Sequence, residues 1–325
     1  MTHAIRMHTT GGPEVLSWEP YDPGMPEPGE VRLIHEAIGL NFIDVYHRSG
    51  LYPLPAFPAI PGLEGAGTVE MVGEGVTEFR KGDRVAYAGQ PPGAYAEVRN
   101  IPAHRLVKLP EEISTRQGAA MMLQGMTARY LLKGCYPVQA GSTLLIHAAA
   151  GGVGSLVCQW ASHIGATVIG TVGSAEKARA AQENGCTHTI LYREEDFAER
   201  VKDITKGRGV DVVYDSVGKT TFMKSLDCLR PMGMMVTFGQ SSGPIGPIDT
   251  GILAQKGSLF LTRPTLMVYT AKREDLLAHA RDLFNVVASG AVKIRIMQEY
   301  PLRDAARAHR DLEDRKTRGS SILVP

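Results

Sequence analysis

Apolar and polar residues alternate along this chain with two different periods, and the change comes near residue 114. Before that point, short apolar runs with partial period-two spacing occupy 31–40, 65–73 and 82–87. Spacing of this kind predicts half-buried strands. Prolines gather between residues 53 and 61, which favours ordered loops over helix there. We therefore expect residues 1–125 to form a small, barrel-like β domain.

From residue 114 onward the pattern becomes an alternation of strand-like and helix-like segments. Residues 114–134 predict a helix. The expected strands are 144–146, 166–172, 187–192, 210–215, 234–239 and 258–262, and the intervening helical segments are 155–161, 175–183, 196–205 and 220–229. Alternating strands and helices imply a parallel, doubly wound sheet. We thus expect an α/β protein with a second domain at 126–265.

The last part of the chain, residues 266–325, follows no strict alternation. It predicts a helix at 273–288, a strand at 292–296, a charged helix at 304–316 and a short terminal strand at 321–324. We expect this segment to return to the first domain.

A glycine-rich turn lies between the first expected strand of the second domain and the helix that follows. Ala149, Gly151 and Gly154 occupy the three positions of a G-x-G-x-x-G pattern, with alanine in place of the first glycine. Gly151 would let the backbone approach a pyrophosphate, and Gly154 would let helix and strand pack closely. The free N–H groups of the helix N-terminus attract phosphate. In this strand–turn–helix context the pattern predicts dinucleotide binding.

The end of the next strand indicates which dinucleotide is bound. NAD-binding folds usually carry an acidic residue there for the ribose 2′-hydroxyl, but this chain has Gly173 and Ser174 after Val172. Lys177 and Tyr192 lie nearby in the expected fold. Donors and a cation favour a 2′-phosphate, which a carboxylate would repel. The pattern favours NADPH over NADH, although a single lysine is more often simply a solvated side chain.

Composition excludes several other classes. The chain has 325 residues, of which 43% are hydrophobic and 21% charged, and its net charge is +1. That balance gives no electrostatic reason to expect nucleic acid or an anionic membrane as a partner. No apolar run is long enough to cross a bilayer, and the four cysteines form no C-x-x-C pair. We expect a cytoplasmic protein without disulfides.

Motifs spread over nearly the whole chain carry a family resemblance. They are GLNFID at 39–44, PGLEGAG at 61–67, GDRV at 82–85, AAAGGVG at 148–154, YDSVG at 214–218 and GSS at 319–321. With these motifs the chain resembles the zinc-free quinone oxidoreductase branch, which includes zeta-crystallin, of the medium-chain dehydrogenase/reductase superfamily. The resemblance implies a GroES-like β-barrel domain and a Rossmann domain.

The zinc-dependent relatives in this superfamily place a cysteine where Asn41 stands and a histidine where Leu63 stands. Leucine cannot bind a metal, and the remaining carboxylate of Glu64 does not make a site by itself. We therefore expect no metal. Without a Lewis acid, the substrate must already be electrophilic.

The resemblance also implies which residues act. It places Asn41, Tyr46, Tyr52 and Thr127 around the nicotinamide and the substrate, with both tyrosines in a proline-rich loop. Asn41 could donate to an oxyanion, and the tyrosines could stack on a ring, donate a proton, or only pack. The expected cofactor-binding residues are Ala150, Gly151, Gly152, Val153, Gly173, Ser174, Lys177, Tyr192, Ser216, Phe238 and Ser241.

The resemblance implies, and we expect, an NADPH-dependent quinone oxidoreductase that acts on a small-molecule quinone or another electrophilic acceptor. Two alternatives remain at this stage: an NADPH-dependent reductase of activated carbon–carbon double bonds, and a cofactor-binding structural or RNA-binding protein. The apolar run 258–262 would form an edge strand of the open sheet. Such an edge invites pairing with another chain, so we expect a homodimer.

Overall fold

The computed structural model of this protein describes residues 2–325. The chain divides into two compact units, which are described separately. The first comprises residues 2–126 with Thr270–Ala288 and Ile294–Pro325, and the second comprises Thr127–Tyr269 with Ser289–Lys293. Most of the C-terminal segment thus belongs to the first unit, but its beginning up to Tyr269 and the short piece Ser289–Lys293 pack with the second.

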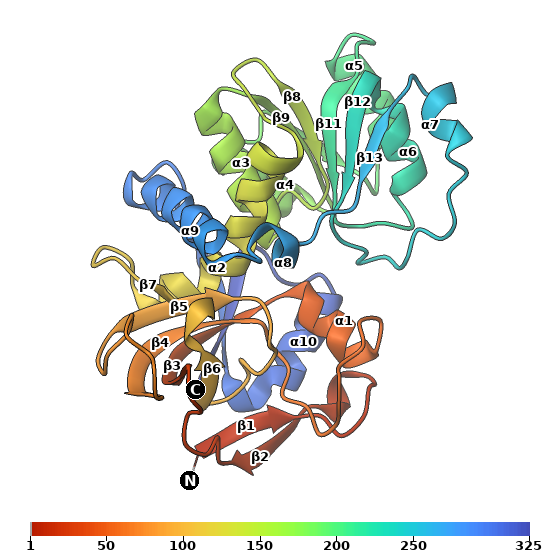
Figure 1. The fold of residues 1–325 in the computed structure, drawn as a ribbon. Helices are drawn as coiled ribbons and strands as arrows, with labels where there is room; N and C mark the ends of the chain where they lie inside the picture. The colour runs from red at the N-terminus through yellow and green to blue at the C-terminus, as the bar shows by residue number, and fades with distance from the viewer. Residues whose placement is uncertain (1) are drawn as a thin grey trace. The chain divides into compact units, whose positions relative to one another are not determined.

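The first unit is built mainly from β-strands (Figure 1). Strands β1 (Thr2–Arg6) and β2 (Ser17–Tyr21) form an antiparallel pair. A seven-stranded sheet has the order β14-β15-β3-β4-β5-β7, and β6 also pairs with β3. Its strands are β3 (Glu30–Leu40), β4 (Glu64–Val72), β5 (Arg84–Ala88), β6 (Val98–Pro102), β7 (Val107–Lys108), β14 (Ile296–Pro301) and β15 (Ser320–Val324). One apolar cluster, which includes Leu33, Tyr95 and Leu323, forms its core.

Strand β14 corrects the expected strand at 292–296, because pairing begins at Ile296 and continues to Pro301. The apolar alternation of Val292, Ile294 and Ile296 gave the wrong position. Strand β14 lies at the edge of the sheet, where polar residues such as Gln298 and Glu299 are tolerated. Its hydrogen-bonding partner β15, rather than its own hydrophobic pattern, determines where it lies.

Four helices of eight or more residues accompany these strands. They are α1 (Phe42–Ser49), α2 (Thr115–Arg129), α9 (Arg273–Ala288) and α10 (Ala305–Glu313). Helix α2 begins in the first unit and ends in the second, where a π-helical turn (Tyr130–Cys135) continues it. Helix α1 replaces the loop expected around Tyr46. Its N-terminus is half of a capping box, since the Asn41 N–H donates to Asp44 Oδ2 at 2.9 Å.

The second unit is a six-stranded parallel sheet in the order β10-β9-β8-β11-β12-β13. The strands are β8 (Thr143–Ile146), β9 (Thr167–Val172), β10 (His188–Leu191), β11 (Val210–Asp215), β12 (Leu229–Thr237) and β13 (Phe260–Thr262), and the helices are α3 (Gly152–Ile164), α4 (Ala175–Glu183), α5 (Phe197–Ile204), α6 (Phe222–Asp227), α7 (Gly251–Gln255) and α8 (Leu266–Tyr269). Helices lie on both sides of the sheet (Figure 1). The doubly wound sheet predicted from the sequence is confirmed. The strand order reverses between β8 and β11, which is where such folds bind ligands.

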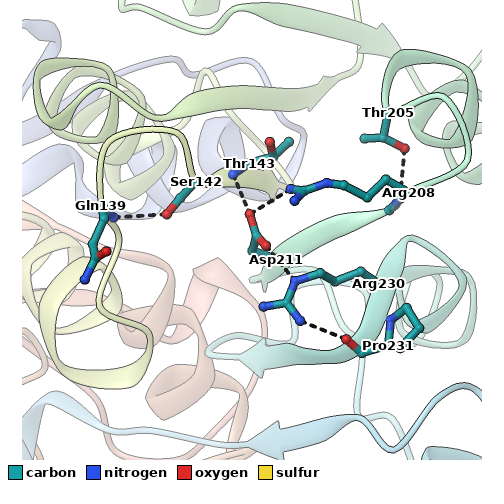
Figure 2. Close-up of polar contacts among 9 residues, drawn as sticks. Gln139, Ser142, Thr143, Thr205, Arg208, Asp211, Arg230 and Pro231 are labelled. Carbon is teal, nitrogen blue, oxygen red and sulfur yellow. Dashed lines mark hydrogen bonds and ion pairs between the residues drawn. The ribbon is translucent and has the colours of Figure 1, made fainter.

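Asp211 holds the amino ends of three neighbouring strands together (Figure 2). Its carboxylate accepts hydrogen bonds from Thr143 N at 2.7 Å, from Arg208 Nη2 at 3.0 Å and from Arg230 Nε at 2.6 Å. Burial alone would raise the pKa of Asp211, but these donors hold the pKa below its usual value. Strands β8, β11 and β12 are parallel and begin at this end of the sheet, so their carboxyl ends lie at the opposite end.

Candidate active site

The turn from β8 into α3 is shaped by small residues. Gly151 is the N-cap of α3 and offers no side chain to the helix, so the first N–H groups of α3 have no capping acceptor from it. A Cβ at Gly154 would lie 2.3 Å from the backbone oxygen of Ala148, which no side chain tolerates. The close helix–strand packing expected for Gly154 is therefore present. Ala150, Gly151, Gly152 and Val153 lie at this helix N-terminus, where the free N–H groups and the dipole suit a pyrophosphate.

The carboxyl end of β9 carries a second group of expected cofactor residues. Ser174 is the N-cap of α4, and its hydroxyl oxygen accepts from Lys177 N at 3.3 Å. The hydroxyl proton remains available to donate to a ligand. A Cβ at Gly173 would lie 2.9 Å from the Tyr192 hydroxyl, so Gly173, Ser174, Lys177 and Tyr192 form one cluster. The nearest acidic residue in sequence, Glu176, lies in the first turn of α4.

Loops after β11 and β12 bring the remaining expected cofactor residues together. Ser241 N donates to the backbone oxygen of Ser216 at 3.2 Å, and Phe238 N donates to that of Asp215 at 2.8 Å. The buried carboxylate of Asp215 accepts from Val217 N at 2.7 Å, which fixes the start of the first loop. Ser216, Phe238 and Ser241 thus lie at the same sheet edge as the glycine turn. All eleven expected cofactor residues follow the carboxyl ends of strands in the second unit.

In the first unit, the Asn41 side chain lies in a buried hydrogen-bonded network. Asn41 Nδ2 donates to Glu64 Oε2 at 2.6 Å, and Gln124 Nε2 donates to Asn41 Oδ1 at 3.1 Å. Ser320 Oγ in turn donates to Gln124 Oε1 at 2.8 Å. Strands β3, β4 and β15 and helix α2 each contribute one of these residues directly or at their ends.

Two buried carboxyl groups lie beside Asn41. Burial raises the pKa of Glu64 to about 8, although hydrogen bonds from Asn41 and from Leu123 N oppose the shift. Burial likewise raises the pKa of Asp44 to about 7. Tyr95 donates to Asp44 Oδ2 at 3.0 Å, and the same hydroxyl lies 3.0 Å from His309 Nε2. This side of α1 is therefore fixed by a polar network that reaches α10.

Tyr46 and Tyr52 lie together in the first unit. Their ring centroids are 5.1 Å apart in an edge-on arrangement, and Tyr52 N donates to the Tyr46 backbone oxygen at 3.0 Å. Tyr46 lies on α1 and is buried, whereas Tyr52 follows the helix and is half-buried. The expectation that both lie in a loop was wrong for Tyr46, because the capping residues around Asn41 start a helix there.

Thr127, the fourth residue expected near the substrate, belongs to the second unit. It is buried, and its hydroxyl is hydrogen-bonded to the Tyr130 hydroxyl one turn further along the chain. The Tyr130 ring stacks on Tyr269, with centroids 4.8 Å apart. Thr127 is thus held by the end of α2 and the turn that follows.

The residues at the positions of the zinc ligands do not fit a metal. Leu63 is fully buried and has no donor atom, the Asn41 amide is engaged as described, and both Glu64 oxygens accept hydrogen bonds. Among residues 2–325, no three His, Cys, Asp or Glu side chains gather in a way that could hold a metal ion. No helix in the same range is long and apolar enough to cross a membrane.

Sequence reasoning missed three residues that the fold places around Asn41. Gln124 lies 83 residues beyond Asn41 in the sequence, and Ser320 lies 196 residues beyond Gln124. Nothing in the local sequence marks Gln124, and Ser320 was noted only as part of the GSS motif, with no role assigned to it. Asp44 did carry a signal, because Asn41 and Asp44 have the spacing of a capping box.

Comparisons with known proteins agree with this fold. Residues 27–111 match the alcohol dehydrogenase GroES-like domain, and residues 152–279 match the zinc-binding dehydrogenase family. The chain is 51% identical to a quinone oxidoreductase of Pseudomonas aeruginosa, with both chains covered completely. It is 47% identical to a 2-haloacrylate reductase of a Burkholderia species, over 100% of this chain and 99% of that protein.

Among solved structures, the quinone oxidoreductase of Escherichia coli, complexed with NADPH, superimposes with a TM-score of 0.98. It is 50% identical, and the match covers 99% of this chain and 100% of that one. The family of this chain follows from three findings: a GroES-like unit, a parallel Rossmann sheet and this degree of identity along the full length. The chain belongs to the quinone oxidoreductase branch of the medium-chain dehydrogenase/reductase superfamily.

Proposed function

We propose that this protein is an NADPH-dependent quinone oxidoreductase that works without zinc. The proposal rests on sequence identity. The chain is 51% identical over its full length to one quinone oxidoreductase and 50% identical to another, whose structure was solved with NADPH. The second unit supports it, because its carboxyl edge offers an uncapped helix N-terminus together with the cluster of Ser174, Lys177 and Tyr192 in place of an acidic residue.

In this proposal the cofactor residues divide into three groups. The N-terminus of α3, from Ala150 to Val153, binds the pyrophosphate. Gly173, Ser174, Lys177 and Tyr192 bind the 2′-phosphate, and Ser216, Phe238 and Ser241 line the remaining part of the groove. NADPH, when bound, supplies the hydride.

In this proposal, residues of the first unit bind the quinone. Asn41 donates a hydrogen bond to the quinone oxygen on which negative charge develops. Tyr46 and Tyr52 pack against the planar ring. In the second unit, Thr127 lies near the nicotinamide. A hydroquinone anion can take its proton from water, so this reaction requires no dedicated acid.

Turnover with a panel of acceptors tests this function. Purified protein should oxidise NADPH with benzoquinones and naphthoquinones much faster than with enones or 2-haloacrylates. Greater activity on the carbon–carbon double bonds would favour the activity of the Burkholderia relative instead. Retained NADPH binding without turnover of any acceptor would favour the structural or RNA-binding alternative.

Zinc content gives a direct check of the metal-free assignment. Elemental analysis of protein purified in zinc-supplemented medium should find far less than one zinc atom per chain, because the chain offers no ligand at Leu63. Prolonged dialysis against a chelator should leave quinone turnover unchanged. Stoichiometric zinc whose removal abolishes turnover would contradict the proposal.

We also propose that the protein works in a reducing cytoplasm, which keeps the four cysteines free.

We further propose that two copies pair through β13. Strand β13 is an edge strand, and Phe260 on it is 58% exposed. Sedimentation equilibrium at micromolar concentration should give twice the 35.1 kDa of one chain. Phe260→Asp should shift the protein toward the single-chain mass, whereas a wild-type protein of single-chain mass would refute the pairing.

A further inference from the structure

The side-chain amide of Asn41 has one fixed orientation. Its Nδ2 donates to Glu64 Oε2 at 2.6 Å, and its Oδ1 accepts from Gln124 Nε2 at 3.1 Å. An amide nitrogen carries two N–H groups, and Glu64 takes one of them. No other residue in the described chain accepts a hydrogen bond from this nitrogen. The second N–H is therefore the donor that Asn41 has left for a ligand.

Glu64 sets the donor-to-acceptor direction along the whole hydrogen-bonded network. Ser320 donates to Gln124, Gln124 donates to Asn41, and Asn41 donates to Glu64. The other Glu64 oxygen accepts from Leu123 N at 2.7 Å. Two donors thus converge on this carboxyl group. An amide in its place would have only one acceptor oxygen for the two donors.

The surroundings leave the network little freedom. Glu64 is fully buried, and Asn41 and Gln124 are each at most 6% exposed, so water does not compete for these bonds. Gly39 makes room for the carboxyl group, because a Cβ there would lie 2.1 Å from Glu64 Oε2. The contact between Asn41 and Glu64 is also short.

We propose that Glu64 is a positioning residue, which turns the Asn41 amide so that its remaining N–H, and not its oxygen, faces the quinone oxygen. The inference rests on the proposed function, since it gives Asn41 a substrate contact. Glu64 itself touches no substrate. It acts by setting the orientation of the Asn41 amide, and so whether an N–H group or the oxygen faces the substrate.

Reversing the polarity of the network tests this role. Glu64→Gln alone leaves either Leu123 N–H or the Asn41 amide without its acceptor, and Gln124→Glu alone points a carboxylate at the Asn41 oxygen. The double variant Glu64→Gln/Gln124→Glu again gives each hydrogen bond of the network one donor and one acceptor if the Asn41 amide turns over. Its oxygen then faces position 64, its nitrogen faces position 124, and Ser320 donates to the new carboxylate.

The double variant separates a positioning role from a structural one. We expect its unfolding midpoint to return close to that of wild type, while kcat with quinones stays about tenfold or more below wild type, since a single oxyanion donor is often worth that much. The KM for NADPH should change little. Recovery of kcat together with stability would overturn the proposal. Glu36→Gln is the matched control, because Glu36 also accepts two side-chain hydrogen bonds in this unit but does not contact Asn41.

A readout independent of turnover covers the case in which the double variant fails to fold. In ¹⁵N-labelled wild-type protein, the two Nδ2 protons of Asn41, identified by their loss in Asn41→Asp, should be well separated and resist exchange. Glu64→Gln should change this signal, and Glu36→Gln should not. A wild-type signal like that of an exposed amide would overturn the inference. Absence of quinone turnover in wild type, with this signal present, would instead contradict the proposed function alone.

Discussion

Replacing Gly154 with alanine is expected to disrupt folding of the second unit. The new Cβ would lie 2.3 Å from the Ala148 backbone oxygen and 2.9 Å from two Ala149 backbone atoms, and none of these can move without shifting β8 or α3. Overpacking against backbone costs about 3 kcal/mol or more, out of a total stability of about 5–15 kcal/mol. Chemical denaturation should show this loss, together with poor recovery of soluble protein.

Gly151→Ala is the matched comparison for this substitution. Gly151 has φ −78°, which alanine adopts freely, and a Cβ there would meet only the Ala148 oxygen, at 3.2 Å. This variant should fold with nearly wild-type stability but bind NADPH at least about tenfold more weakly, because its methyl group occupies the approach of the pyrophosphate. Equal stability of the two variants would show that the helix–strand contact at Gly154 is not as tight as described.

Lys177→Ala should weaken the use of NADPH much more than the use of NADH. Lys177 follows the N-cap Ser174 on α4, next to the position where NAD-binding folds carry an acidic residue. Loss of one charge-assisted contact to a phosphate is worth about 1.5–3 kcal/mol, or roughly a ten- to hundredfold rise in KM for NADPH. Steady-state kinetics with both cofactors and one quinone measure this difference.

The control for this prediction is Lys202→Ala, an exposed lysine on α5 in the same unit. It changes the net charge equally and should leave both KM values unaltered. Equal use of NADH and NADPH by the wild-type enzyme would contradict the assignment of the 2′-phosphate site. An equal loss with both cofactors in Lys177→Ala would mean that Lys177 supports α4 rather than the phosphate.

The sequence by itself determined the parallel sheet and the nucleotide turn. Buried parallel strands such as β8 and β11 appear as short apolar runs, and their spacing by helical segments leaves few topologies to choose from. The turn at 148–154 is also local, because Gly154 contacts backbone only a few residues away. Local signals of this kind predicted the cofactor positions in the turn and around Ser174, whereas Ser216, Phe238 and Ser241 were predicted from the family resemblance.

Tertiary structure alone decided how the Asn41 amide is held and where the edge strand lies. Glu64 is 23 residues from Asn41, and Ser320 is 196 residues from Gln124, so no local pattern links them. Strand β14 begins at Ile296 because β15 offers its pairing edge there, although the hydrophobic spacing pointed to 292–296. Backbone turns follow from adjacent residues, whereas buried polar partners and edge strands are selected by contacts that exist only after the chain has folded.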